Sequence, residues 1–249
     1  MLDRTTFLRP IAHRGLHDAT RAIIENSGPA FAAAIAKGFG IECDLRPAAD
    51  GTPIVFHDET LTRLIDAPGA LADLSPRALT QLTYRGSSTP IMTFADLLAQ
   101  VGSRVPLLVE VKSEWAPPDP PFIRALADLA ARYAGPLALM SFDPVVMTAL
   151  KHVAPAIPRG VVSGIYEDDG WWSDKIDDER AFRLSHLLES GPVEPDFFAY
   201  HIEALPTPVT RFVREGLGMP LFTWTVRTPQ QRQIAEKWAD APIFEGYEP

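Results

Sequence analysis

The sequence has one cysteine, Cys43, in 249 residues, and it lacks both a long apolar run and an excess of basic residues. A single cysteine forms no internal disulfide, which is usual in a reducing compartment. No stretch approaches the roughly 18 apolar residues of a membrane-spanning helix. The N-terminal stretch MLDRTTFLRPIAHRG has no apolar run typical of a signal peptide. These absences predict a cytoplasmic protein without stable membrane insertion.

Acidic residues outnumber basic ones, with 32 Asp and Glu against 23 Lys and Arg, for a net charge of −9. Binding to nucleic-acid backbones relies on clustered Lys and Arg, so we expect no nucleic-acid partner. A small phosphate ligand remains compatible with this charge, because one local group of cations is enough to bind it. Nothing in the sequence indicates an oligomeric state.

Short apolar runs alternate with helix-like segments along the chain, which is typical of parallel strands joined by helical crossovers. Eight strands are expected, at 9–13, 40–45, 107–111, 137–141, 159–163, 196–201, 221–226 and 242–245. Helices are expected at 27–37, 93–101, 121–133, 144–153, 178–190, 207–215 and 229–238. This pattern predicts one α/β domain over 1–249, a TIM (β/α)8 barrel. An open doubly wound sheet is less favoured, because no glycine-rich phosphate loop follows the first strand.

Two places depart from a regular barrel. Residues 46–90 separate the second strand from the next helix, and 52–57 within them looks like an extra extended segment after the turn at Asp50-Gly51. A small insertion there would lie at the carboxyl ends of the strands, where barrel active sites form. The chain stops just after the eighth strand, so an eighth helix is missing from the pattern.

Glu42 and Asp44 lie two apart in the expected second strand, so their side chains point to one face. If that face is the barrel lumen, the carboxylates repel each other and lose hydration, and a divalent cation neutralises them well. Solvated acids on an exposed edge, or pairing with arginines, would explain the same residues. Glu110 and Lys112 repeat the pattern in the third strand, where a simple ion pair is the plainer explanation.

Two histidines end extended segments at the expected barrel mouth. His13 ends the first strand and precedes Arg14 and Gly15, and His57 follows the apolar run 54–56. Catalytic groups typically lie at the carboxyl ends of barrel strands, where histidine transfers protons near neutral pH. Arginine binds a phosphate through two parallel hydrogen bonds. Taken alone, His13 and Arg14 would favour a loop histidine with a surface arginine, and the alternative for His57 is a turn residue beside a capping Asp58.

The stretch IAHRGLHD…ENSGPAF…GFGIECDLRPAADGTPIVFHDETLTR resembles the signature of the glycerophosphodiester phosphodiesterase family. That family shows HRG, Glu-Asn, Glu-x-Asp, Asp-Gly and His-Asp with Leu-x-Arg, in this order and spacing. VEVK at 109–112, SFDP at 141–144 and FTWTV at 222–226 extend the resemblance over almost the whole chain. Ile24 departs from the proline that the family often has, and the last strand reads IFEGYEP where the family usually has Thr-Asp.

The resemblance implies a TIM barrel with a small insertion after the second strand, and an enzyme that hydrolyses glycerophosphodiesters to glycerol 3-phosphate and an alcohol. It implies a divalent metal, Mg²⁺ or Ca²⁺, whose ligands match Glu42, Asp44 and Glu110. The acid–base pair matches His13 and His57. Substrate-binding positions match Arg14, Lys112 and Trp224. Which histidine is the acid stays open, as does the choice between water and a glycerol hydroxyl as nucleophile.

Two other functions fit similar residues. The related lysophospholipase D and sphingomyelinase D barrels act on lipids, which an apolar, exposed mouth would favour. A catalytically silent phosphodiester-binding homologue would be favoured by loss of His13 or His57, and both are present. Trp171 and Trp172 are expected to pack or to cover a loop. Further candidates for the walls of the site are Arg46, Trp115 and His201.

Overall fold

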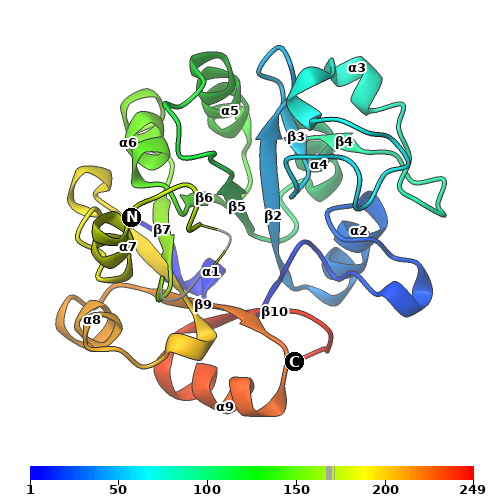
Figure 1. Cartoon of the computed structure of the whole chain (residues 1–249). Coiled ribbons are helices and arrows are strands. Elements are labelled where there is room, and N and C mark those ends of the chain that lie inside the picture. The colour runs from blue at the N-terminus through cyan, green and yellow to red at the C-terminus, as the bar shows by residue number, and fades with distance from the viewer. Residues whose placement is uncertain (167–169, 171) are drawn as a thin grey trace.

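The computed structural model describes residues 1–166, 170 and 172–249, and the chain forms a ring of parallel strands with helices outside it (Figure 1). Trp171 lies outside the described residues. The barrel strands are β1 (Ile11–Ala12), β2 (Gly40–Pro47), β5 (Leu107–Val111), β6 (Leu137–Ser141), β7 (Arg159–Ser163), β8 (Phe197–His201), β9 (Leu221–Val226) and β10 (Ala241–Phe244). They follow one another around the ring in chain order. The predicted TIM barrel is confirmed, and the open-sheet alternative is wrong.

The barrel closes through its shortest strand. β1 pairs with β2 on one side and with β10 on the other, both in parallel. The sequence predicts a longer first strand, over 9–13, but the observed strand begins after Pro10, whose ring leaves no N–H for a sheet hydrogen bond. In the described part of the chain no helix follows β10, and the ring closes without one.

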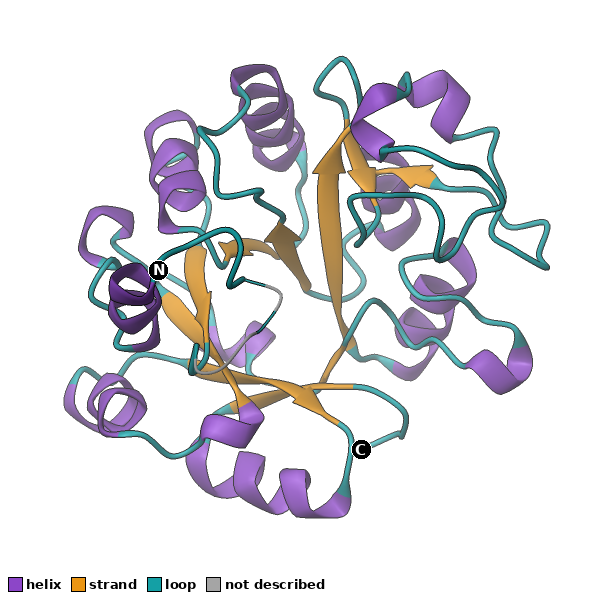
Figure 2. Ribbon diagram, viewed as in Figure 1, coloured by secondary structure: helices purple, strands orange, loops and turns teal. Residues whose placement is uncertain are grey.

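The helices between the barrel strands cover the outside of the ring (Figure 2). Those between barrel strands are α2 (Gly28–Lys37), α4 (Phe94–Val101), α5 (Pro120–Arg132), α6 (Pro144–Val153), α7 (Asp178–Ser185), α8 (Pro208–Arg211) and α9 (Pro229–Trp238). Short turns are η1 (Ala19–Arg21), η2 (Leu71–Asp73), η3 (Gly191–Val193), η4 (Ile202–Ala204) and the π-helical η5 (Phe212–Gly216). The helix expected over 207–215 is therefore divided between α8 and η5. Among the described residues, no helix has the length and apolar character to cross a membrane.

Capping side chains begin most of these helices. Thr228 and Thr93 form capping boxes at α9 and α4, with their side chains accepting from the backbone three residues on. Ser27 precedes α2, but its hydroxyl donates to the Ile24 carbonyl at 2.5 Å and makes no capping hydrogen bond to that helix. The helix expected over 27–37 is therefore confirmed, and it begins at Gly28.

The lumen is filled from the end at which the chain enters it. A short helix, α1 (Arg4–Phe7), brings Leu2 and Phe7 against Ile11, and these pack with Phe197 and Phe222 in one buried apolar cluster. A cavity is lined by residues at the carboxyl ends of the strands, beyond this apolar filling.

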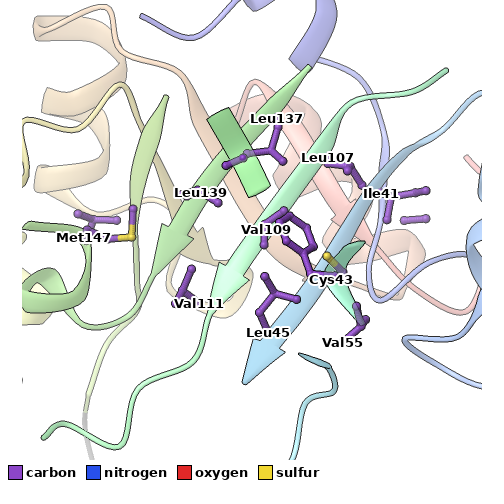
Figure 3. Packing of buried hydrophobic residues seen from close by; sticks show 14 of the residues in the cluster. Ile41, Cys43, Leu45, Val55, Leu107, Val109, Val111, Leu137, Leu139 and Met147 are labelled. Carbon is purple, nitrogen blue, oxygen red and sulfur yellow. The ribbon is translucent and has the colours of Figure 1, made fainter. Parts of the chain in front are cut away.

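β2 separates two chemically different faces. Ile41, Cys43 and Leu45 pack outward into the apolar layer under the helices, as Figure 3 shows. Glu42 and Asp44 alternate with them and therefore point into the lumen. Cys43 is fully buried, and burial raises the pKa of its thiol well above the ordinary value.

The insertion after β2 has a small core of its own. β3 (Pro53–Val55) pairs antiparallel with β2 after the predicted turn, and β4 (Met92–Thr93) pairs with β3. η2 and α3 (Pro76–Leu79) complete it. Its apolar cluster includes Ile54, Phe56, Leu61 and Tyr84. The Tyr84 hydroxyl donates to the Asn26 carbonyl at 3.1 Å, which ties the insertion to the loop after β1.

Gly160→Ala is expected to destabilise the barrel. Gly160 lies opposite Phe197 in the β7–β8 pair, and a Cβ there would lie 2.2 Å from the Phe197 ring. Overpacking of this kind costs about 1–3 kcal/mol. Chemical denaturation should show a lower free energy of unfolding, whereas Gly191→Ala, which has open space around the new Cβ, should behave as wild type. Equal stabilities for the two variants would contradict the packing argument.

Candidate functional site

Three carboxylates meet at the open end of the lumen. Asp44 lies opposite Glu110 in the β2–β5 register. Glu42 is two residues before Asp44 in β2 and therefore points to the same face of the sheet. Glu42 and Asp44 are each 1% exposed and Glu110 is 8% exposed. One carboxylate oxygen from each lies within 4.8 Å of the others. The predicted convergence of these residues is therefore present, and the edge-strand alternative is wrong.

Two cations offset part of this negative charge. Lys112 Nζ lies 2.9 Å from Asp44 Oδ1 and 2.5 Å from Glu110 Oε1. Arg14 Nε lies 3.2 Å from Asp44 Oδ2. Burial alone would raise the pKa of Asp44, but the charges of Lys112 and Arg14 outweigh it and hold that pKa well below its ordinary value. Pairing with cations thus compensates the buried negative charge of Asp44 and part of that of Glu110.

Glu42 is not neutralised in the same way. Burial, together with the charges of Asp44 and Glu110, raises the pKa of Glu42 well above its ordinary value. Its Oε1 atom is buried and has no hydrogen-bond partner among the described residues. A buried acceptor without a donor is costly, and three converging oxygen ligands suit a hard divalent cation such as Mg²⁺ or Ca²⁺. The residues present therefore fit such an ion.

The loop after β1 brings Arg14 to this cluster in a left-handed backbone conformation, with φ of 54°. Side chains other than glycine seldom adopt it, and such positions concentrate at functional sites. The Arg14 N–H donates to Glu42 Oε2 at 2.9 Å, and its carbonyl accepts from the Asn26 N–H at 2.9 Å. Asn26 also donates from Nδ2 to Asp44 at 2.8 Å. The carboxylates thus help to fix the loop that bears Arg14.

Each predicted histidine is held through Nδ1 by a carboxylate. His13 Nδ1 lies 2.7 Å from Glu245 Oε2, and its Nε2 lies 3.9 Å from Glu42. His57 Nδ1 lies 2.7 Å from Asp58 Oδ1. Burial lowers the pKa of His13, and the hydrogen bond to Glu245 offsets part of that effect. A carboxylate on Nδ1 leaves Nε2 as the ring atom that can exchange a proton with a ligand.

A cavity of about 530 Å³ joins these groups. Its lining includes the predicted residues His13, Arg14, Glu42, His57, Glu110, Lys112 and Trp224, and the further candidates Arg46, Trp115 and His201. Asp44 is not among the lining residues that the structure describes, and it contacts the cavity wall through its two cations. Trp224 packs against Phe142 and His201, with ring centroids 5.2 Å and 4.7 Å apart, so an aromatic wall faces the charged one.

A family model described as the glycerophosphoryl diester phosphodiesterase family matches residues 13–245. The chain belongs to this family. The matched region begins at His13 and ends at Glu245, the two residues joined by the hydrogen bond described above.

Similarity to individual proteins agrees with this membership. Glycerophosphodiester phosphodiesterase 1 of Mus musculus is 34% identical over 106 residues, which cover 42% of this chain and 29% of the mouse protein. The crystal structure of a glycerophosphodiester phosphodiesterase from Thermotoga maritima matches with a TM-score of 0.71 and 22% identity, over 95% of this chain and 93% of that one. A phosphodiesterase of Oleispira antarctica in complex with the product sn-glycerol-3-phosphate matches with a TM-score of 0.72 and 21% identity, over 95% and 92%. At these identities the two structures show the shared barrel fold.

Sequence reasoning missed the carboxylates that hold the functional side chains. Glu245 lies at the end of the eighth strand, where this family member departs from the usual Thr-Asp, and its position alone was the available signal. Burial would raise the pKa of Glu245, but hydrogen bonds from His13 and Arg227 lower it to about 2. It is therefore an anion at neutral pH and favours the protonated form of His13.

Glu245→Gln is expected to lower the pKa of His13 further. The substitution keeps a hydrogen-bonding group but removes the Glu245 charge that favours the imidazolium, so less remains to offset the lowering effect of burial on the His13 pKa. NMR titration of the His13 ring protons measures this pKa. Glu248→Gln makes the same charge change on an exposed residue paired with Lys37 and should leave the His13 titration as in wild type. An unchanged His13 pKa in Glu245→Gln would contradict this role of the carboxylate.

Proposed function

We propose that this family member hydrolyses glycerophosphodiesters to glycerol 3-phosphate and an alcohol in the cavity at the barrel mouth. The observation that carries the proposal is the meeting of two carboxylate-held histidines, His13 and His57, with a buried cluster of carboxylates and cations in one cavity. Its volume of about 530 Å³ lies in the range of small-molecule sites. The product named for the Oleispira antarctica relative supports the choice of substrate.

We propose that Glu42, Asp44 and Glu110 hold a divalent cation, Mg²⁺ or Ca²⁺. The three converging oxygen ligands and the unpartnered Glu42 oxygen support this assignment. When bound, such an ion supplies positive charge that offsets charge on the phosphoryl oxygens.

Arg14 and Lys112 bind the phosphate in this proposal. Arg14 uses Nη1 for Glu25 and has further N–H donors on its guanidinium, and Lys112 has three donors and two carboxylate partners. Both side chains line the cavity. They are therefore able to donate to phosphoryl oxygens while remaining beside their carboxylates.

His13 and His57 move the two protons of the reaction. One removes a proton from the nucleophile, which is either water or the glycerol hydroxyl next to the phosphate, and the other protonates the leaving oxygen. If the glycerol hydroxyl attacks, the alcohol leaves and a cyclic phosphate forms, which water then opens to glycerol 3-phosphate. Trp224 forms the apolar side of the pocket, and its Nε1–H is buried without a partner among the described residues. We propose that a substrate hydroxyl accepts from it.

Removal of divalent ions is expected to abolish hydrolysis reversibly. Treatment with EDTA should reduce release of glycerol 3-phosphate from glycerophosphocholine to background, because the carboxylate cluster then has excess negative charge where phosphate must bind. Mg²⁺, Ca²⁺ or Mn²⁺ added back should restore it, and Asp44→Asn should lower the bound metal found by elemental analysis. Full activity in the chelator with no metal bound would refute the metal assignment. The same assay with lysophosphatidylcholine tests the lipid alternative, which a strong preference for that substrate would support.

His13→Ala and His57→Ala should each fold and lose activity. Both side chains lie at the cavity, so stability should change by less than about 1–2 kcal/mol, whereas loss of acid–base help typically costs about 10²–10⁴-fold in rate. The double variant should resemble the worse single variant, because the two act in one transition state. A nitrophenyl diester needs no acid and should restore only the variant of the acid histidine.

The control for this pair is His186→Ala, which removes an exposed histidine at the end of α7 and should keep full activity. kcat/KM on both substrates and circular dichroism give the comparison. Near-normal hydrolysis of glycerophosphocholine by either active-site variant would show that the substituted histidine is not catalytic.

A further inference from the structure

One arginine of the insertion, Arg63, bridges two carboxylates, Asp58, which lines the cavity, and Glu25, which is not among the described residues that line it. Arg63 Nη1 and Nη2 donate to the two oxygens of Glu25 at 3.0 and 2.7 Å. Its Nε and Nη2 donate to the two oxygens of Asp58 at 2.5 and 3.0 Å. The guanidinium therefore makes a two-pronged contact with each carboxylate, and Nη2 is shared between them.

Each of these carboxylates holds a different functional side chain. Glu25 Oε1 accepts from Arg14 Nη1 at 2.7 Å, and Asp58 Oδ1 lies 2.7 Å from His57 Nδ1. Arg14 reaches the phosphate position from the loop after β1, and His57 reaches the cavity from the insertion. Arg63 is thus the common partner of the two carboxylates through which both residues are held.

We infer that Arg63 is a positioning residue that fixes Arg14 and His57 relative to each other. The inference rests on the proposed function, in which Arg14 binds the phosphate and His57 moves a proton. Arg63 is not among the described residues that line the cavity, so it acts through Glu25 and Asp58 and not on the substrate.

The guanidinium shape is what the role requires. A planar fork of five N–H groups satisfies two carboxylates in fixed directions, and bidentate contacts set orientation as well as distance. Lysine supplies the same charge from a single nitrogen and cannot reproduce four directed contacts. Without either cation, Glu25 and Asp58 would repel each other and shift the side chains that they hold.

The insertion does not depend on Arg63 for its place. It is anchored by the β2–β3 pairing, by the apolar cluster around Phe56 and Leu61, and by the bond from Tyr84 to Asn26. The Arg63 side chain is 45% exposed, so its removal leaves no buried cavity. Loss of Arg63 should therefore alter the two held side chains and leave the fold intact.

Steady-state kinetics on glycerophosphocholine test this role. Arg63→Met and Arg63→Lys should both lower kcat/KM by about 10- to 100-fold, since misplacement by on the order of 1 Å has effects of that size. Glu25→Gln should act mainly on KM through Arg14, Asp58→Asn mainly on kcat through His57, and Arg63→Met on both. The matched control is Arg77→Met, an exposed arginine of the same insertion, which should keep wild-type kinetics. Near-wild-type kinetics of Arg63→Lys would reduce the role to charge and overturn the inference.

A double-mutant cycle measures the connection itself. Glu25→Gln and Asp58→Asn should be non-additive in kcat/KM by about threefold or more while Arg63 is present. In the Arg63→Met background the two effects should become additive, because no shared partner remains. Additive effects with Arg63 present would overturn the inference.

Crystal structures of wild type and Arg63→Met separate this inference from the proposed function. A wild-type protein that hydrolyses no glycerophosphodiester contradicts the proposed function only, and the side-chain positions then decide the inference. Displacement of Arg14 and His57 by on the order of 1 Å supports the positioning role, and unmoved side chains overturn it. Circular dichroism on each variant shows whether it folds. If Arg63→Met does not fold, the crystal structure of Arg63→Lys is compared with that of wild type instead.

Discussion

The balance between three buried carboxylates and the cations beside them is the constraint on which the barrel mouth depends. Carboxylates removed from water are costly unless paired, so Glu42, Asp44 and Glu110 require positive partners at fixed places. Lys112 supplies one from the position directly after β5, the strand that bears Glu110, and Arg14 supplies the other from a loop in a left-handed conformation. The Glu42 side chain accepts the Arg14 N–H and so helps to hold that conformation.

The two ends of the barrel lumen differ in chemical character, one apolar and one polar. Apolar side chains, with Leu2 and Phe7 from the N-terminal segment, fill one end and supply rigidity. The other end bears the polar groups on strand ends and on the loops that follow them, as is typical of TIM barrels. The insertion, which has its own small apolar core, bears His57 together with Asp58 and Arg63. One histidine of the proposed acid–base pair therefore lies on a part of the chain that packs separately from the barrel interior.

The sequence alone was sufficient for the parts of the fold that follow local patterns. Apolar strands, helix starts such as Thr228, and the alternation of Glu42 with Cys43 depend on neighbouring residues, and the structure confirms them. The partners of the site residues could not be predicted in this way. His13 and Glu245 are 232 positions apart, and their contact follows from ring closure. The π-helical form of the second half of the helix expected at 207–215 was also not predicted.

The wider charge network was missed for the same reason. Glu25 and Arg63 belong to motifs of the family, but their contact depends on how the insertion folds over the loop after β1. Sequence spacing indicates neither the direction of a guanidinium nor which of several acids it reaches. Residue types at strand ends are therefore predictable here, whereas the pairs that they form require the three-dimensional structure.

The position of Cys43 makes the thiol a natural reporter of global opening. It is the protein's one cysteine and is fully buried beneath the helices on the outer face of β2. A reagent that alkylates thiolates can reach it only when that strand separates from its covering layer. The time course of labelling under native conditions would therefore follow unfolding of the barrel wall, with no background from a second thiol. A cysteine engineered on the surface would accept a probe in the folded state while the native one stays unmodified.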